Sequence, residues 1–297
     1  MELSCIVTAD QQLERAGYVT HPAMWGDAYC AFAQQVSLAI EHKVPLIIAG
    51  DLLEESYPDS VTVQAMFQQF DRMEQSRLPV YYIQGNHELV RRQPWAGLHS
   101  WPTHIHEKIV QIGNFSVAGL DYQPVTHLRE AISRLPSGID VLVVHQAWQE
   151  FMGEHIPSDG SLKELIPNTI KVVVTGDFHV HKHFWMPAAL GSQYDMLVLS
   201  PGSATLQSIS EDSEKYVYGL GQHLPQFKSI PIRNRPVEKV TIATPAQGAM
   251  VLESLMLKAK KAQEDSSLPV PIRTPMWVVY LHAAATSFIP EPCHSIS

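Results

Sequence analysis

Short apolar runs alternate with segments of helical periodicity along most of this chain, and this alternation constrains the fold more than any other feature. Leu3–Val7 and Val44–Ala49 are too short for helices and indicate buried strands. Between them, apolar side chains recur every four residues, which predicts a helix from Asp27 to His42. Strands joined by helices in this way favour a layered α/β domain with some parallel pairing. Further strands are expected at Pro79–Ile83, Val141–Val144, Val172–Val174 and Met196–Leu199, and a further helix at Ser60–Met73 with Asp59 or Ser60 as its N-cap.

The pattern changes after Gly202. Ser229–Val240 is rich in proline and arginine, which predicts a linker. A smaller unit follows, with a strand at Lys239–Ala243, a helix at Ala246–Gln263 and a strand at Met276–His282. We therefore expect a large domain of residues 1–236, followed by a small α+β unit and tail of residues 237–297.

Composition excludes several classes of protein. A hydrophobic fraction of 45% and a charged fraction of 17% are typical of a globular chain, and no apolar run reaches the length of a membrane span. The net charge of −9 argues against a protein that coats nucleic acid by charge alone. Three scattered cysteines make no disulfide framework, and the first residues show no secretory signal, so a cytoplasmic location is expected.

Polar side chains gather where the predicted strands end. Carboxyl ends of strands are where ligand sites form in α/β sheets. The side chains at these ends supply carboxylates, amide oxygens and imidazoles, a set suited to divalent metals, and a carboxylate such as Asp51 can bridge two ions. Any one of these segments is common in loops, but the whole ordered set is hard to obtain by chance. The segments are Thr8–Gln12, Gly50–Glu54, Gly85–Glu88, His145–Gln146 and Gly176–His179.

This ordered set resembles the calcineurin-like metallophosphoesterase superfamily. That family's pattern is Asp-x-His, then Gly-Asp, then Gly-Asn-His followed by Asp or Glu, then a later His, and finally Gly-His-x-His. The resemblance implies a four-layer α/β/β/α sandwich, here with a small C-terminal α+β cap over residues 237–297. It also implies a metal-dependent phosphoesterase with a dinuclear metal site.

Site residues follow from the resemblance by position. His87 would lie beside the scissile phosphate, where it stabilises charge or protonates the leaving oxygen, and Glu88 would orient His87. The first metal ion would be held by Asp10, Gln12, Asp51 and His179, and the second by Asp51, Asn86, His145 and Asp177.

Two positions depart from the family pattern. Gln12 stands where the family usually has His, and Asp177 replaces the first His of Gly-His-x-His. Each change trades an imidazole for an oxygen, which shifts the expected metal toward Mn²⁺ or Mg²⁺ and away from Zn²⁺. His181 is an open alternative to Asp177 as a ligand.

Features around the motifs resemble one branch of the superfamily, the SbcD-type DNA repair exonucleases and their phage-encoded relatives. This branch implies a manganese-dependent nuclease acting on DNA, an SbcC-type ATPase as partner, and a homodimer formed through early helices, with Phe67 to Phe70 as the place to look. Arg91 and Arg92 would contact the DNA backbone. The features are Leu52–Glu54, His145–Gln146, Ser200–Ser203, Ile230–Ile232 and Arg235–Pro236.

Two other functions stay open from the sequence. A small-molecule phosphodiesterase or phosphatase would use the same fold and metal site, and the acidic net charge suits it, but it would not need the C-terminal unit. A non-catalytic scaffold that holds little metal is the second alternative, and Gln12 and Asp177 are the residues in its favour.

Overall fold

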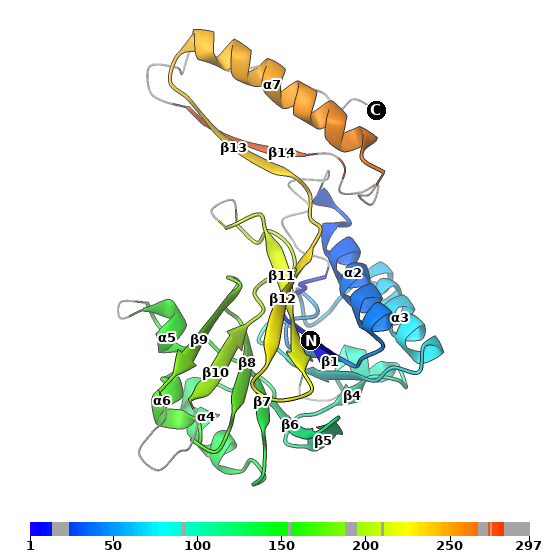
Figure 1. The fold of residues 1–297 in the computed structure, drawn as a ribbon, viewed down its shortest axis with the longest axis vertical. Coiled ribbons are helices and arrows are strands. Elements are labelled where there is room, and N and C mark those ends of the chain that lie inside the picture. The colour runs from blue at the N-terminus through cyan, green and yellow to red at the C-terminus, as the bar shows by residue number, and fades with distance from the viewer. Residues whose placement is uncertain are drawn as a thin grey trace.

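Two six-stranded β-sheets form the centre of the molecule (Figure 1). The computed structural model describes residues 1–13, 24–90, 93–153, 156–187, 195–208, 211–266, 273 and 275–281. The first sheet has the strand order β12 (Phe227–Ile232), β11 (Lys215–Gly221), β1 (Leu3–Thr8), β2 (Leu46–Ala49), β3 (Val80–Ile83) and β4 (Thr103–His104). The second has the order β5 (Ile109–Ile112), β6 (Phe115–Leu120), β7 (Val141–His145), β8 (Val172–Gly176), β10 (Met196–Ser200) and β9 (Lys182–Met186).

Helices cover the outer face of each sheet. Helices α2 (Asp27–His42) and α3 (Ser60–Gln75) pack on the first sheet, and a 3-10 turn at Trp95–Leu98 follows β3. The side chain of Asp59 caps α3 by accepting a hydrogen bond from the Thr62 N–H at 2.7 Å. The second sheet is covered by α4 (Val125–Ser133), α5 (Gln149–Met152) and α6 (Leu162–Leu165).

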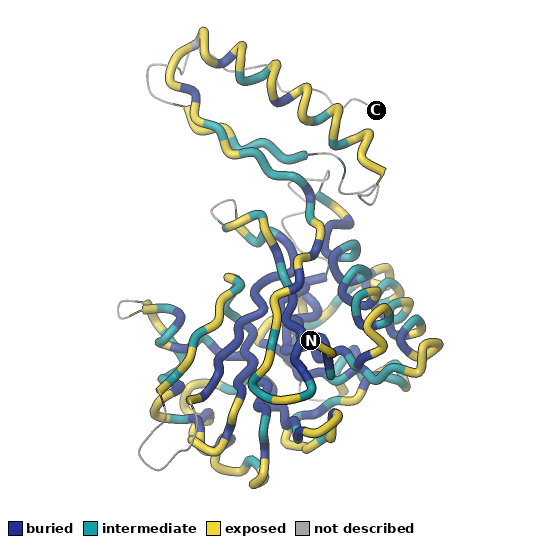
Figure 2. The backbone as a smooth tube through the Cα atoms, viewed as in Figure 1, coloured by how far each residue is buried: buried dark blue, intermediate teal, exposed yellow. Residues whose placement is uncertain are grey.

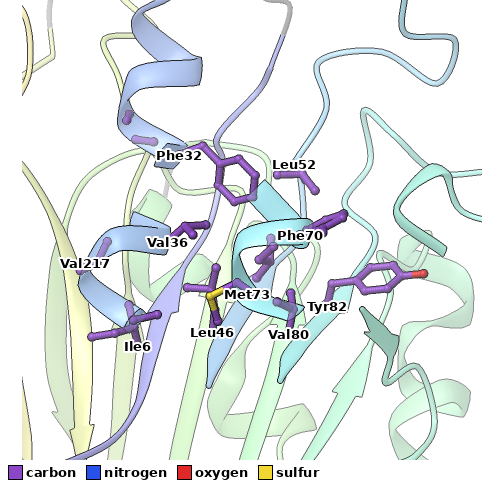
Figure 3. Close-up of a cluster of buried hydrophobic side chains, with 14 of the residues drawn as sticks. Ile6, Phe32, Val36, Leu46, Leu52, Phe70, Met73, Val80, Tyr82 and Val217 are labelled. Carbon is purple, nitrogen blue, oxygen red and sulfur yellow. The ribbon is translucent and has the colours of Figure 1, made fainter. Parts of the chain in front are cut away.

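Three hydrophobic cores separate these four layers. The first lies between the first sheet and helices α2 and α3 (Figure 3), the second lies between the two sheets, and the third lies under α4 to α6. In β2, Leu46 and Ile48 belong to the first core, whereas Ile47 and Ala49 belong to the second. The central strands are thus buried on both faces, as Figure 2 shows, which is why they appear in the sequence as unbroken apolar runs. The expected α/β/β/α sandwich is confirmed.

Strands β13 (Val237–Ile242) and β14 (Met276–Leu281) pair in parallel and are joined by α7 (Pro245–Glu264). These three elements, which we call the C-terminal unit, lie apart from the stacked sheets in Figure 1. The unit has the predicted order of strand, helix and strand, and its first strand begins at Val237. The division of the chain into two domains stays a prediction. Residues 282–297 of the expected tail lie outside the described residues.

The linker predicted at Ser229–Val240 is wrong. Residues 227–232 form β12, residues 237–242 form β13, and only four residues join the two strands. Proline suggested a linker because it cannot donate a ladder hydrogen bond, but Pro231 lies in a strand at the edge of its sheet, where no such bond is needed.

Helix α2 is fixed at its first residue by a distant part of the chain. Asp27 accepts hydrogen bonds from Arg235 at 2.9 and 2.6 Å in a buried bidentate ion pair.

Among the helices in the described part of the chain, none is both long enough and apolar enough to span a bilayer. Phe70, named above for a dimer contact, is fully buried in the first core, so it cannot offer that surface.

Candidate metal centre

The predicted site segments follow β1, β2, β3, β7 and β8, and they meet at one edge of the two stacked sheets. The backbone N–H of Asp10 donates to the Gly50 carbonyl at 3.1 Å, and the N–H of Gln12 donates to the Asp51 carbonyl at 2.9 Å. These bonds join the loops after β1 and β2. The site therefore lies on backbone that the sheets themselves position.

Four of the predicted ligands have left-handed backbone conformations, with φ of 51° at Asp10, 44° at Gln12, 50° at Asp51 and 75° at Asp177. Residues other than glycine adopt such angles in only about a few per cent of cases. A conformation of this kind costs on the order of 1–3 kcal/mol and persists only where the surrounding structure enforces it. Here it turns the chain sharply at each strand end, next to the cluster of polar side chains.

The centre of the site is a buried cluster of Asp10, Asp51 and His145, whose candidate ligand atoms lie within 4.8 Å of one another. His145 Nε2 lies 3.3 Å from Asp51 Oδ2, and it lies 3.9 Å from both Asp10 Oδ1 and Asp177 Oδ1. His145 Nδ1 donates to the Ala49 carbonyl at 2.8 Å, so the carbonyl fixes the ring with Nε2 toward the carboxylates.

Further predicted ligands lie around this cluster. Asn86 Oδ1 lies 3.1 Å from His145 Nε2, and His179 Nε2 lies 3.9 Å from Asp10 Oδ1. The Asp177 N–H also donates to Asp10 Oδ1 at 3.2 Å. Gln12 is buried beside the cluster and is joined to it through its backbone bond to Asp51. The structure thus brings all seven predicted ligand positions to one place.

Burial and the charges of neighbouring groups shift the pKa values of the cluster residues. Burial raises the pKa of Asp10 to about 6, and it also raises the pKa of Asp177. Burial alone would lower the pKa of His145, but the carboxylates around it, Asp51 foremost, raise that pKa well above its usual range. Burial likewise opposes ionisation of Asp51, yet His145 holds the pKa of Asp51 below its usual value.

These residues fit divalent metal ions. Asp10 is fully buried, and its Oδ2 has no hydrogen-bond partner among the described residues. Buried carboxylates are normally paired or bound to a metal, because an isolated buried charge is costly. Three carboxylates facing two imidazoles and an amide oxygen supply the oxygen-rich set that Mn²⁺ and Mg²⁺ favour.

His87 lies at the exposed side of the cluster. Its Nδ1 donates to the Glu54 carbonyl at 2.9 Å, and its Nε2 lies 4.0 Å from Asp51 Oδ2. The side chain is 38% exposed, so Nε2 can reach a bound substrate from the edge of the cluster. This geometry is compatible with the place expected for His87 beside a scissile phosphate.

The predicted role of Glu88 is wrong. Its carboxylate accepts hydrogen bonds from the N–H groups of Leu52, Leu53 and Gly85, at 3.2, 3.0 and 3.4 Å, rather than contacting His87. Burial and the charge of Asp51 raise the pKa of Glu88 to about 8 against the effect of these donors. Glu88 thus joins the loops after β2 and β3, and the Glu54 carbonyl orients His87. The sequence gives no sign of this because the orienting atom belongs to the backbone.

His181 takes no part in the cluster. Its Nδ1 contacts the Pro201 carbonyl at 3.0 Å, its Nε2 contacts Ser229 Oγ at 2.8 Å, and its ring stacks on Tyr218. Of the two residues that the sequence left open, Asp177 is the one that lies beside the cluster. Arg91 and Arg92 lie outside the described residues.

One residue near the cluster was missed by sequence reasoning. Glu211 Oε1 lies 3.6 Å from His179 Nδ1, on the side of the ring opposite Asp10. Burial would raise the pKa of Glu211, but His179 and Lys215 lower it to about 2. Glu211 belongs to no motif and lies in a segment without periodicity, so no pattern in the sequence could have identified it.

The structure has two stacked sheets with a cluster of carboxylates and histidines at their shared edge. This arrangement defines a class of proteins that use divalent metal ions. The model of the calcineurin-like phosphoesterase family matches residues 21–181, which is more than half of the chain. The chain belongs to this family, as its motifs predicted.

Two known proteins show how far the similarity extends. The chain is 26% identical over 241 residues to the DNA double-strand break repair protein Mre11 of Saccharolobus solfataricus, an alignment that covers 73% of this chain and 61% of that protein. The chain thus matches less than two thirds of that relative's length. Among solved structures, it is similar to TT1561 of Thermus thermophilus, with a TM-score of 0.47, 16% identity, and coverage of 77% of this chain and 98% of that one.

Proposed function

We propose that this chain is a metal-dependent phosphodiesterase that hydrolyses the DNA backbone, as an SbcD-type nuclease does. The observation that carries the proposal is the buried cluster of Asp10, Asp51 and His145, to which the loop bearing His87 is attached. Family membership supports phosphoester hydrolysis as the reaction. The similarity to Mre11, a DNA double-strand break repair protein, supports DNA as the substrate.

In this proposal Asp51 would contribute to the binding of two divalent ions, Mn²⁺ by preference. When bound, such ions supply charge neutralisation at the phosphate and lower the pKa of water. One ion would be held by Asp10, Gln12, Asp51 and His179, and the other by Asp51, Asn86, His145 and Asp177. The hydrogen bond from His145 Nδ1 to Ala49 leaves Nε2 free to ligate once it is deprotonated.

His87 is the side chain that would act directly on the phosphate or on the leaving oxygen. The Glu54 carbonyl fixes the proton of the His87 ring on Nδ1 and directs Nε2 toward the cluster. When Nε2 is protonated, it stabilises negative charge on the phosphate or donates its proton to the leaving oxygen. Because the side chain is 38% exposed, it can reach a substrate that approaches from solvent.

The C-terminal unit is the proposed cap, and residues 1–236 are the proposed catalytic domain. A cap is useful for positioning a long polymer such as DNA, whereas a small diester needs none. The partner we propose is an SbcC-type ATPase, because the sequence resembles that branch and the aligned relative acts in double-strand break repair.

The test compares two substrates and three metal conditions. End-labelled DNA and bis-p-nitrophenyl phosphate are each incubated with Mn²⁺, with Mg²⁺ and without metal. We expect manganese-dependent cleavage of DNA, reduced about 10²- to 10⁴-fold in His87→Ala with metal content unchanged. His42→Ala is the matched control. His42 is exposed at the C-terminal end of α2, which precedes the start of β2, whereas the cluster lies where the strands end.

Other outcomes select other functions. Cleavage of the small diester alone favours a small-molecule phosphodiesterase, which the net charge of −9 also suits. If neither substrate is cleaved and the metal content is low, the proposal is wrong and the scaffold is favoured. Asp51→Asn should lose bound metal, and full occupancy in that variant would contradict the bridging role of Asp51.

A further inference from the structure

The two nitrogens of the His179 ring face two different carboxylates. Nε2 lies 3.9 Å from Asp10 Oδ1 in the cluster, and Nδ1 lies 3.6 Å from Glu211 Oε1 on the far side. A histidine that ligates a metal usually presents its other nitrogen to a carboxylate or carbonyl, which fixes both the tautomer and the direction of the ring. Glu211 stands in that place for His179.

Glu211 is itself held firmly. Its Oε2 accepts hydrogen bonds from Lys215 Nζ at 2.7 Å, from the Gln207 N–H at 3.0 Å and from Ser203 Oγ at 3.2 Å. These bonds use one carboxylate oxygen and leave Oε1 directed at His179. Lys215 is buried, and the side chain of Glu211 is 13% exposed, so the carboxylate has little freedom to turn away.

The same residue contacts the C-terminal unit. Lys239, in β13, donates from Nζ to the Glu211 backbone carbonyl at 2.6 Å. Glu211 therefore contacts the proposed cap through its backbone and a proposed metal ligand through its side chain. A shift of β13 would act on the backbone of Glu211, and the carboxylate would carry that shift to the His179 ring.

We propose that Glu211 is a positioning residue that directs His179 toward the metal ions. We also propose that the hydrogen bond from Lys239 makes the position of Glu211 depend on the position of the C-terminal unit. The proposal rests on the proposed metal centre, because it takes His179 as a ligand. It deepens that function by giving the C-terminal unit an effect on the metal centre that is separate from contact with DNA.

The experiment titrates Mn²⁺ alone into the metal-free full chain and follows binding by calorimetry. Glu211→Gln should weaken binding of one ion by about 10- to 100-fold, the usual effect of losing such a partner. Lys239→Met should weaken it at least about fivefold, the lower range of coupling between sites. The matched control is Lys258→Met, because Lys258 pairs with Glu238 within the C-terminal unit at 2.9 Å and should leave binding unchanged.

A structural role is separated from a positioning role by a second readout. In the metal-free protein, ¹⁵N–¹H spectra of the imidazoles report which nitrogen of His179 carries the proton, with His179→Gln used to assign the signal. We expect a proton on Nδ1 in the wild type and a change in this signal in Glu211→Gln. Glu211→Asp keeps the charge beside Lys215 but shortens the reach to His179, so it serves if Glu211→Gln does not fold.

The outcomes distinguish this proposal from the proposed function. Unchanged Mn²⁺ affinity and an unchanged His179 signal in a folded Glu211 variant overturn the positioning role. Equal effects of Lys239→Met and Lys258→Met overturn the link to the C-terminal unit. If the wild type binds no Mn²⁺, the proposed function fails, and the His179 signal of the metal-free protein still decides whether Glu211 sets the state of the ring.

Discussion

Three glycines stand directly before predicted ligands, and each allows another residue of the site to approach closely. A Cβ at Gly50 or Gly176 would meet the His145 ring, and one at Gly85 would meet the Asp51 carboxylate and backbone. The Gly-Asp and Gly-Asn pairs of the motifs are therefore a packing requirement of the cluster as well as a turn. Each glycine makes room for a predicted ligand that comes from another strand, either in the same sheet or in the facing one.

Gly85→Ala tests this requirement. The added methyl group would displace Asp51, so we expect a loss of stability of about 1–3 kcal/mol, as for other overpacked sites. We also expect Mn²⁺ to bind more weakly. Urea unfolding and metal analysis measure the two effects.

The control for Gly85→Ala is Gly138→Ala. A Cβ at Gly138 meets nothing within 4 Å, so this variant adds only backbone strain, at a φ of 82°, and should keep its metal content. Normal metal content in Gly85→Ala as well would contradict the packing argument.

The ionisation of Glu211 predicts how stability depends on pH. Its folded pKa of about 2 lies below the ordinary value of 4.5. The stabilisation from the carboxylate is therefore complete above pH 4.5 and is lost as the pH falls toward 2, since the unfolded chain takes up the proton first. Unfolding free energies at several pH values should fall less steeply in Glu211→Gln than in the wild type. Parallel curves would show that the ion pair contributes nothing.

The candidate ligands could be predicted because they lie in short motifs at the ends of buried strands, and these motifs resemble those of the family. The partners of His87 and His179 could not. The Glu54 carbonyl is a backbone atom, and the Glu211 carboxylate comes from a segment with no pattern of its own; both reach these rings from parts of the chain that are distant in sequence. Contacts of this kind depend on the folded backbone.

At the scale of elements, one buried ion pair joins the start of α2 to the segment before β13. Asp27 and Arg235 are 6% and 4% exposed at their side chains, and both oxygens of the carboxylate are used. Gln34, further along α2, also donates to the Arg233 carbonyl at 2.8 Å and accepts from the Arg233 N–H at 2.9 Å. The chain therefore leaves the sandwich for the C-terminal unit in a fixed direction.

Arg235→Ala should destabilise the protein by about 3–5 kcal/mol, because it leaves Asp27 buried without its charged partner. Denaturant unfolding measures the loss. Arg134→Ala removes exposed ion pairs with Glu107 and Glu130 and should cost no more than about 1 kcal/mol. Similar losses in the two variants would mean that the buried pair has no special role.

Helices and strands were predicted correctly where one hydrophobic pattern continued over the whole element. Helix α2 has the bounds that the apolar spacing predicted, and the strands that carry the site lie within a few residues of their expected bounds. Strands β4, β5, β6, β9 and β11 were not predicted, and β12 was mistaken for linker. Strands β4, β5, β9 and β12 lie at sheet edges, where exposed residues break the apolar run. Strands β6 and β11 lie inside their sheets and are largely buried, so this reason does not apply to them.

At the scale of the whole molecule, all residues of the three hydrophobic cores in the described part of the chain lie before Arg233. The C-terminal unit adds nothing to them, and many of its large apolar side chains, such as Met250 and Met256, are exposed. Figure 2 shows this contrast between the buried sheets and the largely exposed unit. The sandwich should therefore be stable without the unit, which makes the expected boundary near residue 236 open to experiment.

A chain that ends at residue 236 keeps every described residue of the three cores, the Asp27–Arg235 pair and all the predicted ligands, but it loses Lys239. We expect it to unfold cooperatively with a midpoint near that of the full chain, because no core is cut. We also expect it to bind Mn²⁺ at least about fivefold more weakly, because the hold on Glu211 is released. Calorimetry of unfolding and of Mn²⁺ binding measures both. A truncated chain that fails to fold would mean that the two parts form one cooperative unit, whereas unchanged Mn²⁺ affinity would limit the C-terminal unit to a role in binding substrate.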